Sequence, residues 1–240
     1  MGSTNFRYQF HLYWYKVALI IITFFCLSQS AQAQMFRINH DDKKLYFGIM
    51  MGYNNSNFRI EPSEYFVNND SILTVLGPKG RGFNLGIITN LKLAKHLDLR
   101  FTPGVAFSNR PLEYKQIGNF TEVKRIESVL LQAPIWLKFK SDRYNNFRFY
   151  VLGGARLDYD LASNSKKRKA DDIVKLGRFD LSADYGIGVQ IFFPLFIFSP
   201  EITISQGLPN IHVPSPTLNY SNVLNKLFSR TIMFKLQFEG

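Results

Sequence analysis

Two long alternating segments between Gly82 and Ser108 limit what this chain can fold into more than any other feature. Nearly every second residue in each segment is apolar, and the residues between are polar, charged or small. The apolar positions include Phe83, Leu85, Ile87, Leu91 and Leu93, then Leu97, Leu99, Phe101, Val105 and Phe107. A period of two is typical of β-strands, so we predict a long antiparallel hairpin with one apolar and one polar face.

The lengths of these segments indicate which solvent meets the apolar face. Each has roughly 10 to 12 residues, whereas strands of globular proteins most often have about 5 to 6. A tilted strand that crosses a bilayer needs about 9 to 11 residues. The hairpin alone is still compatible with a soluble sandwich, so the choice between a soluble and a membrane-spanning sheet depends on the rest of the chain.

The same alternation recurs along the chain. We predict strands at 44–54, 82–93, 97–108, 125–140, 147–161, 180–193, 196–206 and 230–239. Long connections are expected at 55–81, 109–124, 162–179 and 207–226, with a short element around 72–76, and short turns lie between the others. A soluble sandwich has no reason to gather its long loops at one end.

This rhythm is the pattern of an outer-membrane barrel, with short periplasmic turns, longer outer loops and both ends in the periplasm. In lipid the sheet must close on itself, because an open edge would leave backbone groups unpaired. We therefore predict an all-β chain that forms an eight-stranded antiparallel transmembrane β-barrel, an up-and-down meander in the outer membrane.

The N-terminus has the features of a secretory signal peptide. Two basic residues precede the apolar run 17–27, and Ala31-Gln32-Ala33 is a small-x-small cleavage site. The run is shorter than the roughly 20 residues of a membrane-spanning helix, which disfavours an uncleaved anchor. We expect a cleaved signal peptide at 1–33, a periplasmic leader at 34–43 and the barrel at 44–240.

Charge and cysteine content narrow the partners. The chain has 29 basic and 18 acidic residues, and its single cysteine, Cys26, lies in the expected signal peptide. An exported chain does not meet nucleic acid, so outer-membrane lipid, lipopolysaccharide or an acidic protein are the expected partners. The basic run Lys166, Lys167, Arg168 and Lys169 reads as solvated loop charge, or as a contact for lipopolysaccharide or a partner protein.

Charged residues recur on the predicted inner face of the barrel: Arg100, Lys138, Arg156, Asp158, Asp184, Glu201 and Lys235. The interior of an eight-stranded barrel is just wide enough for side chains. Because unpaired buried charge is very costly, we expect these residues to form a structural ion-pair network that fills the lumen. A polar conduction path is the alternative, and it would need more strands.

No catalytic or cofactor motif accompanies this pattern. His40, His96 and His212 are scattered and lack metal-ligand spacing, and no nucleophile elbow or phosphate loop occurs. We expect no enzyme activity, cofactor or metal. A lipid-modifying barrel enzyme is the least favoured function.

Three stretches carry a family resemblance: GFNLGIITNLKLAKHLDLRFTPGVAFSNRPLEY at 82–114, LLQAPIWLKFKS at 130–141, and LYFGIMMGYN from Leu45. They resemble PorT, also called SprT, of gliding bacteria. The resemblance implies an outer-membrane component required for type IX protein secretion and gliding. A filled bore indicates assembly or support of the translocon rather than an open pore. The alternative is a generic surface barrel of the OmpX or OmpA kind, with adhesive or protective loops.

Overall fold

The computed structural model describes residues 43–63, 72–116, 121–162, 175–213 and 224–240, and the expected signal peptide and leader lie outside these ranges, apart from Lys43. The described residues form ten strands and contain no helix long and apolar enough to cross a membrane. The strands are β1 (Leu45–Pro62), β2 (Ile72–Leu76), β3 (Gly80–Lys92), β4 (Leu97–Phe101), β5 (Gly104–Gln116), β6 (Thr121–Lys140), β7 (Phe147–Asp160), β8 (Phe179–Phe192), β9 (Ile197–Gly207) and β10 (Leu224–Glu239).

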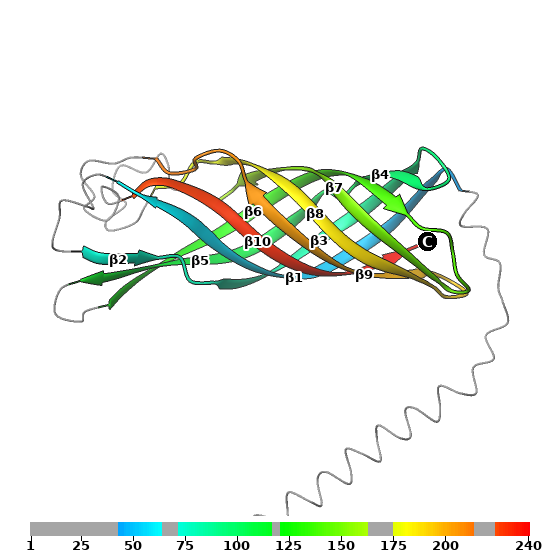
Figure 1. Cartoon of the computed structure of the whole chain (residues 1–240), viewed down its shortest axis with the longest axis horizontal. Coiled ribbons are helices and arrows are strands. Elements are labelled where there is room, and N and C mark those ends of the chain that lie inside the picture. The colour runs from blue at the N-terminus through cyan, green and yellow to red at the C-terminus, as the bar shows by residue number, and fades with distance from the viewer. Residues whose placement is uncertain (1–42, 64–71, 117–120, 163–174, 214–223) are drawn as a thin grey trace, which may run out of the picture. The chain divides into compact units, whose positions relative to one another are not determined.

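The strands close into a ring (Figure 1), since β1 pairs with both β3 and β10 and every pairing is antiparallel. Strands β4 and β5 are one barrel strand, because their registers against β3 and β6 continue across the gap at Thr102 and Pro103. Pro103 has no N–H to donate to the ladder, which explains the interruption. The ring therefore has eight strands, which confirms the predicted fold class.

Several strands run further than predicted. Strand β1 has 18 residues, β6 has 20 and β10 has 16, more than a bilayer requires. The long loops predicted at 55–81 and 109–124 are wrong in extent, because β1 continues to Pro62 and β5 and β6 occupy most of the second stretch. The connection at 207–226 is shorter too, since β10 begins at Leu224. The short element expected at 72–76 is confirmed as β2, which pairs with β5.

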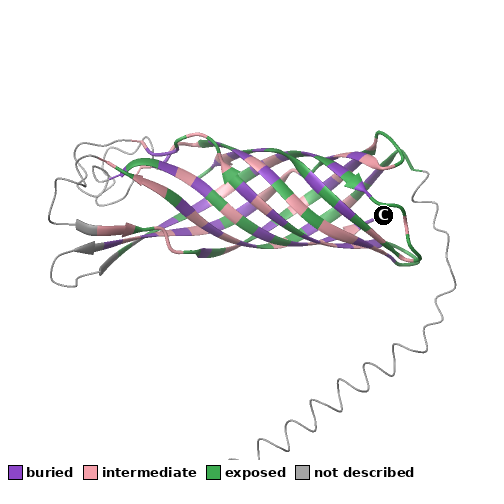
Figure 2. Ribbon diagram, in the orientation of Figure 1, coloured by how far each residue is buried: buried purple, intermediate pink, exposed green. Residues whose placement is uncertain are grey.

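Exposed and buried residues alternate along the strands (Figure 2), and in one part of the barrel the exposed residues are mostly apolar and many buried ones are polar. Ile187 is 62% exposed and Ile135 is 54% exposed, whereas Arg100 and Lys138 have no exposed surface. We call the outward apolar surface the membrane belt. Its members on β1, for example, are Leu45, Phe47, Ile49, Met51 and Tyr53.

Beyond the belt the barrel continues as a second region, the collar, formed by residues 55–62, 72–81, 109–116, 121–127, 175–177, 210–213 and 224–230. Here charged residues such as Arg59 face outward, and apolar side chains such as Phe58, which is 3% exposed, face inward beside a few polar ones such as Arg110. The buried apolar side chains form one cluster of Phe58, Leu112, Tyr114, Ile126, Leu176, Ile211, Leu224 and Leu227. The strands thus keep their alternation while the two faces exchange roles.

Candidate functional site

The lumen is the most highly organised part of the molecule, and Glu201 on β9 lies at its centre. One carboxylate oxygen accepts hydrogen bonds from Arg100 Nη1 at 2.9 Å and from the Tyr150 hydroxyl at 2.9 Å. The other lies 3.2 Å from Lys235 Nζ. Glu201 is 1% exposed. Water cannot solvate its carboxylate there, so these donors take the place of water.

Arg100 joins four strands across the bore. Besides Glu201, it donates to Glu239 at 2.7 Å, to Gln237 at 2.6 Å and to Asn90 at 2.7 Å. These contacts link β4 with β3, β9 and β10, the last strand of the chain. A fully buried guanidinium satisfied in this way holds the barrel closed from inside.

Aromatic side chains fill the space between these charges. Tyr150 lies over Gly188, where an added Cβ would come within 2.3 Å of the ring, so glycine is needed for the close approach. Lys138 Nζ lies 4.2 Å from the Tyr150 ring centre, and Lys235 Nζ lies 4.0 Å from that of Trp136. Lysines over ring faces gain cation–π attraction where water is excluded.

A second group of charged side chains lies on β7 and β8. Arg156 contacts Asp158 at 3.0 Å and Asp184 at 3.7 Å, and it donates to Ser205 at 2.8 Å. Trp136 Nε1 donates to Asp184 at 3.1 Å, so Trp136 bridges the two groups. Further toward the collar, Arg110 lies 3.8 Å from Asp160.

At the rim with the short turns, ionic and aromatic side chains also fill the lumen. Lys140 Nζ lies 2.7 Å from Asp98, which also accepts a hydrogen bond from the Tyr46 hydroxyl at 2.7 Å. Arg143 and Arg148 lie over the ring of Phe192, at 4.0 and 5.3 Å from its centre. Ionic and aromatic side chains therefore follow one another from this rim to the collar.

The structure brings the seven predicted lumen charges into two groups: Arg100, Lys138, Glu201 and Lys235 in one, and Arg156, Asp158 and Asp184 in the other. Sequence reasoning missed Glu239, which lies 2.7 Å from Arg100 and 3.8 Å from Lys138. The alternation of Lys235, Gln237 and Glu239 was the signal that could have found it. The basic run at 166–169 lies outside the described residues.

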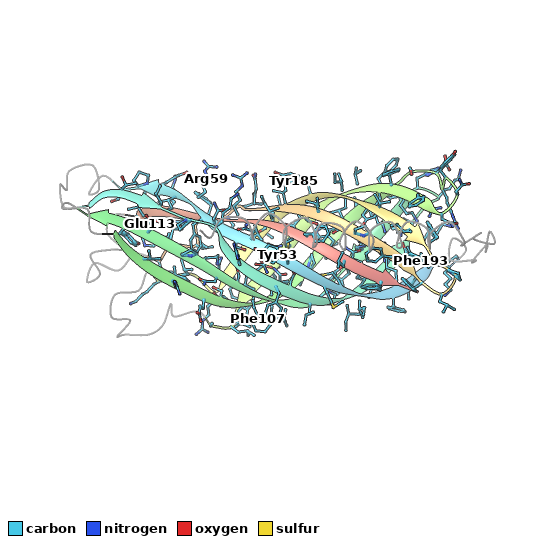
Figure 3. All side chains as sticks on the ribbon, turned by 90° about the horizontal axis from the view of Figure 1, so that it is seen from below. Tyr53, Arg59, Phe107, Glu113, Tyr185 and Phe193 are labelled. Atoms are coloured by element: carbon cyan, nitrogen blue, oxygen red, sulfur yellow. The ribbon has the colours of Figure 1, made fainter. Side chains whose placement is uncertain are left out.

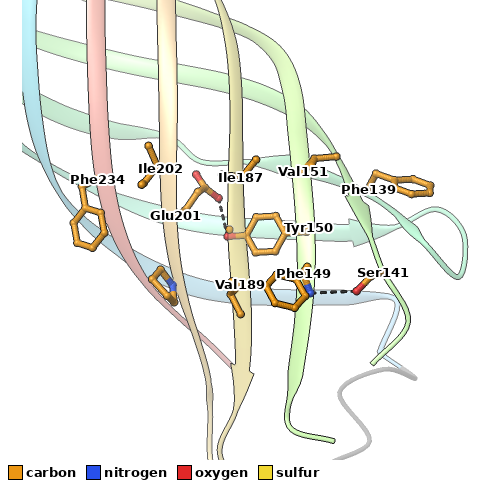
Figure 4. Close-up of a pocket in the computed structure, with 12 residues that line it drawn as sticks. Phe139, Ser141, Phe149, Tyr150, Val151, Ile187, Val189, Glu201, Ile202 and Phe234 are labelled. Carbon is orange, nitrogen blue, oxygen red and sulfur yellow. Dashed lines mark hydrogen bonds between the residues drawn. The ribbon is translucent and has the colours of Figure 1, made fainter. Parts of the chain in front are cut away.

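A separate apolar groove of about 550 Å³ lies on the outer wall over β7, β8 and β9 (Figure 4). Most of its lining side chains belong to the outward-facing set, among them Phe139, Phe149, Val151, Ile187 and Ile202. The groove therefore belongs to the membrane belt and would face lipid chains. In the described part of the chain, no three His, Cys, Asp or Glu residues are grouped to hold a metal ion.

The family model described as "Outer membrane protein beta-barrel domain" matches residues 29–213. This chain belongs to that family. Membership implies an outer-membrane location, as the membrane belt and the closed eight-stranded ring require physically. In a comparison with curated proteins, none matches the chain.

Solved outer-membrane barrels are similar in fold. OprG of Pseudomonas aeruginosa is 12% identical, with 82% of this chain and 97% of that chain covered and a TM-score of 0.47. Neisserial surface protein A (NspA) is 13% identical, with 80% and 95% covered and a TM-score of 0.41. At these identities the likeness concerns the fold alone.

Proposed function

We propose that this outer-membrane barrel is a closed accessory component of the type IX secretion and gliding machinery, which it supports through its collar, turns or outer wall. The observation that carries the closed part of the proposal is the apolar cluster inside the collar. Leu112, Tyr114 and Leu227 have no exposed surface there. A hydrophobic core at the mouth of a barrel leaves little room for a wet path, and folded cargo is far larger than an eight-stranded bore.

The link to secretion comes from the resemblance of residues 82–114 and 130–141 to PorT and SprT. A closed barrel can serve such a machinery by stabilising neighbouring proteins. The partners in this proposal are other secretion-system proteins and outer-membrane lipid, with no nucleic acid. The run at 166–169 stays a predicted contact for lipopolysaccharide or a protein.

Deletion of the gene tests the proposal directly. We expect loss of cargo secretion and gliding, with restoration by the intact gene. Purified protein in planar bilayers should give no stable ion conductance, because the lumen and collar are filled. Normal secretion after deletion would overturn the secretory role, and a steady conductance would overturn the closed state. Each result bears on a different half of the proposal.

A second candidate is a surface barrel with adhesive or protective loops. The collar favours it, because strands that continue past the membrane belt hold the outer connections away from the bilayer. Under this function, deletion should reduce attachment or resistance to host defences while cargo secretion continues. We assign no reaction to the chain, and turnover of labelled lipid by the purified protein would contradict that.

A further inference from the structure

Three exposed arginines lie on the outer face of the collar, one on each of three neighbouring strands. They are Arg230 on β10, Arg59 on β1 and Arg81 on β3. The register sets Arg230 opposite Asn57 and Arg81 opposite Asn55. With strands about 4.8 Å apart and a rise of about 3.4 Å per residue, the Cα atoms of Arg59 and Arg230 are about 8 Å apart, those of Arg81 and Arg230 about 12 Å, and those of Arg59 and Arg81 about 14 Å.

This arginine cluster, Arg59, Arg81 and Arg230, has few counter-charges. Glu61 is the carboxylate nearest to it on β1, and it lies 3.7 Å from Arg59 and 3.3 Å from Lys226. Among the described residues, no carboxylate lies within ion-pair distance, 4.0 Å, of Arg81 or Arg230. The sector therefore has cationic groups available for an anion from outside the chain.

The position of the cluster relative to the membrane belt indicates what kind of anion fits. On the belt side of the cluster, Tyr53 on β1, Phe83 on β3 and Phe107 on β5 lie side by side in register, and the first two are on strands that also carry Arg59 and Arg81. The rings of Phe83 and Phe107 stack at 4.6 Å. Aromatic rows of this kind mark the level of lipid headgroups in outer-membrane barrels. Figure 3 shows Tyr53 and Phe107 on the outer wall and Arg59 further toward the collar end.

The neighbouring part of the collar, on β5 and β6, carries acidic residues as well. On β6, Arg125 has Glu127 two residues away on the same face, and Glu113 lies outward on β5. Arg59 likewise has Glu61 two residues away on β1. Arg81 and Arg230 differ, because no carboxylate lies two residues away on their own strands and the residues paired with them, Asn55, Asn57 and Gln206, are uncharged. The uneven distribution favours one preferred anion site on the wall rather than uniform attraction to any negative surface.

We infer that the arginine cluster binds the phosphate groups of a phosphorylated glycolipid in the outer leaflet, with the acyl chains against the aromatic row below. Guanidinium groups match phosphate geometry with paired hydrogen bonds, which lysine cannot do. The collar faces outward because outer-membrane barrels keep their short turns on the periplasmic side. This site is distinct from the loop run at 166–169 and from any secretory role.

Native mass spectrometry of the purified barrel tests this site, with bis-phosphorylated lipid A and its dephosphorylated form as probes. We expect the intact protein to bind the phosphorylated lipid at least about tenfold more tightly, since each arginine near a headgroup contributes several-fold in affinity. The triple variant R59Q/R81Q/R230Q should lose this preference. It should keep its shift in gel mobility on boiling, because these side chains lie outside the core.

The matched control is Arg125→Gln, which removes an exposed cation at a similar level beside Glu127 and should leave the preference intact. Retention of the preference by the triple variant would overturn the site. So would equal binding of both lipid A forms by the intact protein. If phosphatidylglycerol bound as tightly as lipid A, the assignment to a glycolipid would be wrong.

Discussion

The membrane-embedded part of this barrel and its collar are built from the same strands, but they carry their apolar residues on opposite faces. In β1, outward residues are apolar up to Tyr53 and polar from Asn55 onward, while the inward row changes from Asn54 and Ser56 to Phe58. The embedded part has lipid outside and buried ion pairs inside. The collar has water outside and an apolar core inside. The comparison shows that the solvent around each level decides which face carries the hydrophobic residues.

The difference also concerns how each region is stabilised. Between lipid chains and the belt there is little hydrophobic driving force, so the embedded part depends on backbone pairing and on contacts within the lumen. The collar buries apolar surface from water and gains the ordinary hydrophobic free energy. The following substitutions break or sharpen this contrast, beginning with the largest expected effect.

Arg100→Met should destabilise the barrel most. It leaves Glu201 and Glu239 without a main partner in a buried lumen, and removal of one member of a buried pair costs about 3–5 kcal/mol. Urea unfolding followed by the heat-dependent gel shift measures this. The same substitution at Arg59, whose side chain is 74% exposed, should change stability by less than about 0.5 kcal/mol. Equal effects would contradict the difference between lumen and collar surface.

Leu227→Ala should cost about 2–5 kcal/mol, because it opens a cavity in the apolar core of the collar. Leu137→Ala is the matched control, since Leu137 is 52% exposed on the membrane belt and lipid can fill the space. Unfolding in lipid vesicles should show a much smaller change for Leu137. A larger loss at Leu137 would mean that the belt, rather than the collar, has the tighter packing.

Ile187→Arg tests the lipid-facing side. A charge there should cost about 2–4 kcal/mol if the residue lies near the bilayer midplane. Asn109→Arg places the same side chain on the outer face of the collar and should be close to neutral. Folding yield into vesicles and midpoint of urea unfolding provide the measurement. Tolerance of arginine at Ile187 would contradict the assigned position of the belt.

His212, in the collar, should give the smallest effect. Burial lowers the pKa of this histidine below its ordinary value of about 6.5. The unfolded chain therefore binds a proton more readily, and the contribution of His212 to stability is lost as the pH falls through about 6.5. The difference in unfolding midpoint between wild type and His212→Gln should shrink or reverse from pH 8 to pH 5. A constant difference would contradict this.

Much of the barrel could be predicted from alternation. The faces of the embedded strands, the eight-stranded ring and the inward direction of Arg100, Lys138 and Lys235 follow from a period of two, because a strand has only two faces. The extent of β1, β5 and β6 could not be predicted by looking for an apolar outer face. Phe58 and Ile60 keep the alternation of β1 but continue it on the inward face, so a pattern of outward apolar residues ends before them.

Alternation could not predict which charged side chains pair with one another in the lumen. It places Glu201, Glu239 and Arg100 inside, yet their contact depends on the register of β4, β9 and β10 around the closed ring. Glu239 follows Phe238, the last apolar residue of the alternating pattern, so the pattern does not include it. The outer arginine cluster likewise forms only when β10, β1 and β3 lie side by side.

The sequence by itself determined that this chain forms long strands with one apolar and one polar face, because these are properties of local alternation and length, and the rhythm of long and short connections indicated lipid as the solvent of the apolar face. Only the tertiary structure decided where the two faces exchange roles, which charges meet in the bore, and which arginines share a surface. Those features depend on strand register and ring closure, and closure brings together residues as distant in sequence as Gly48 and Glu239.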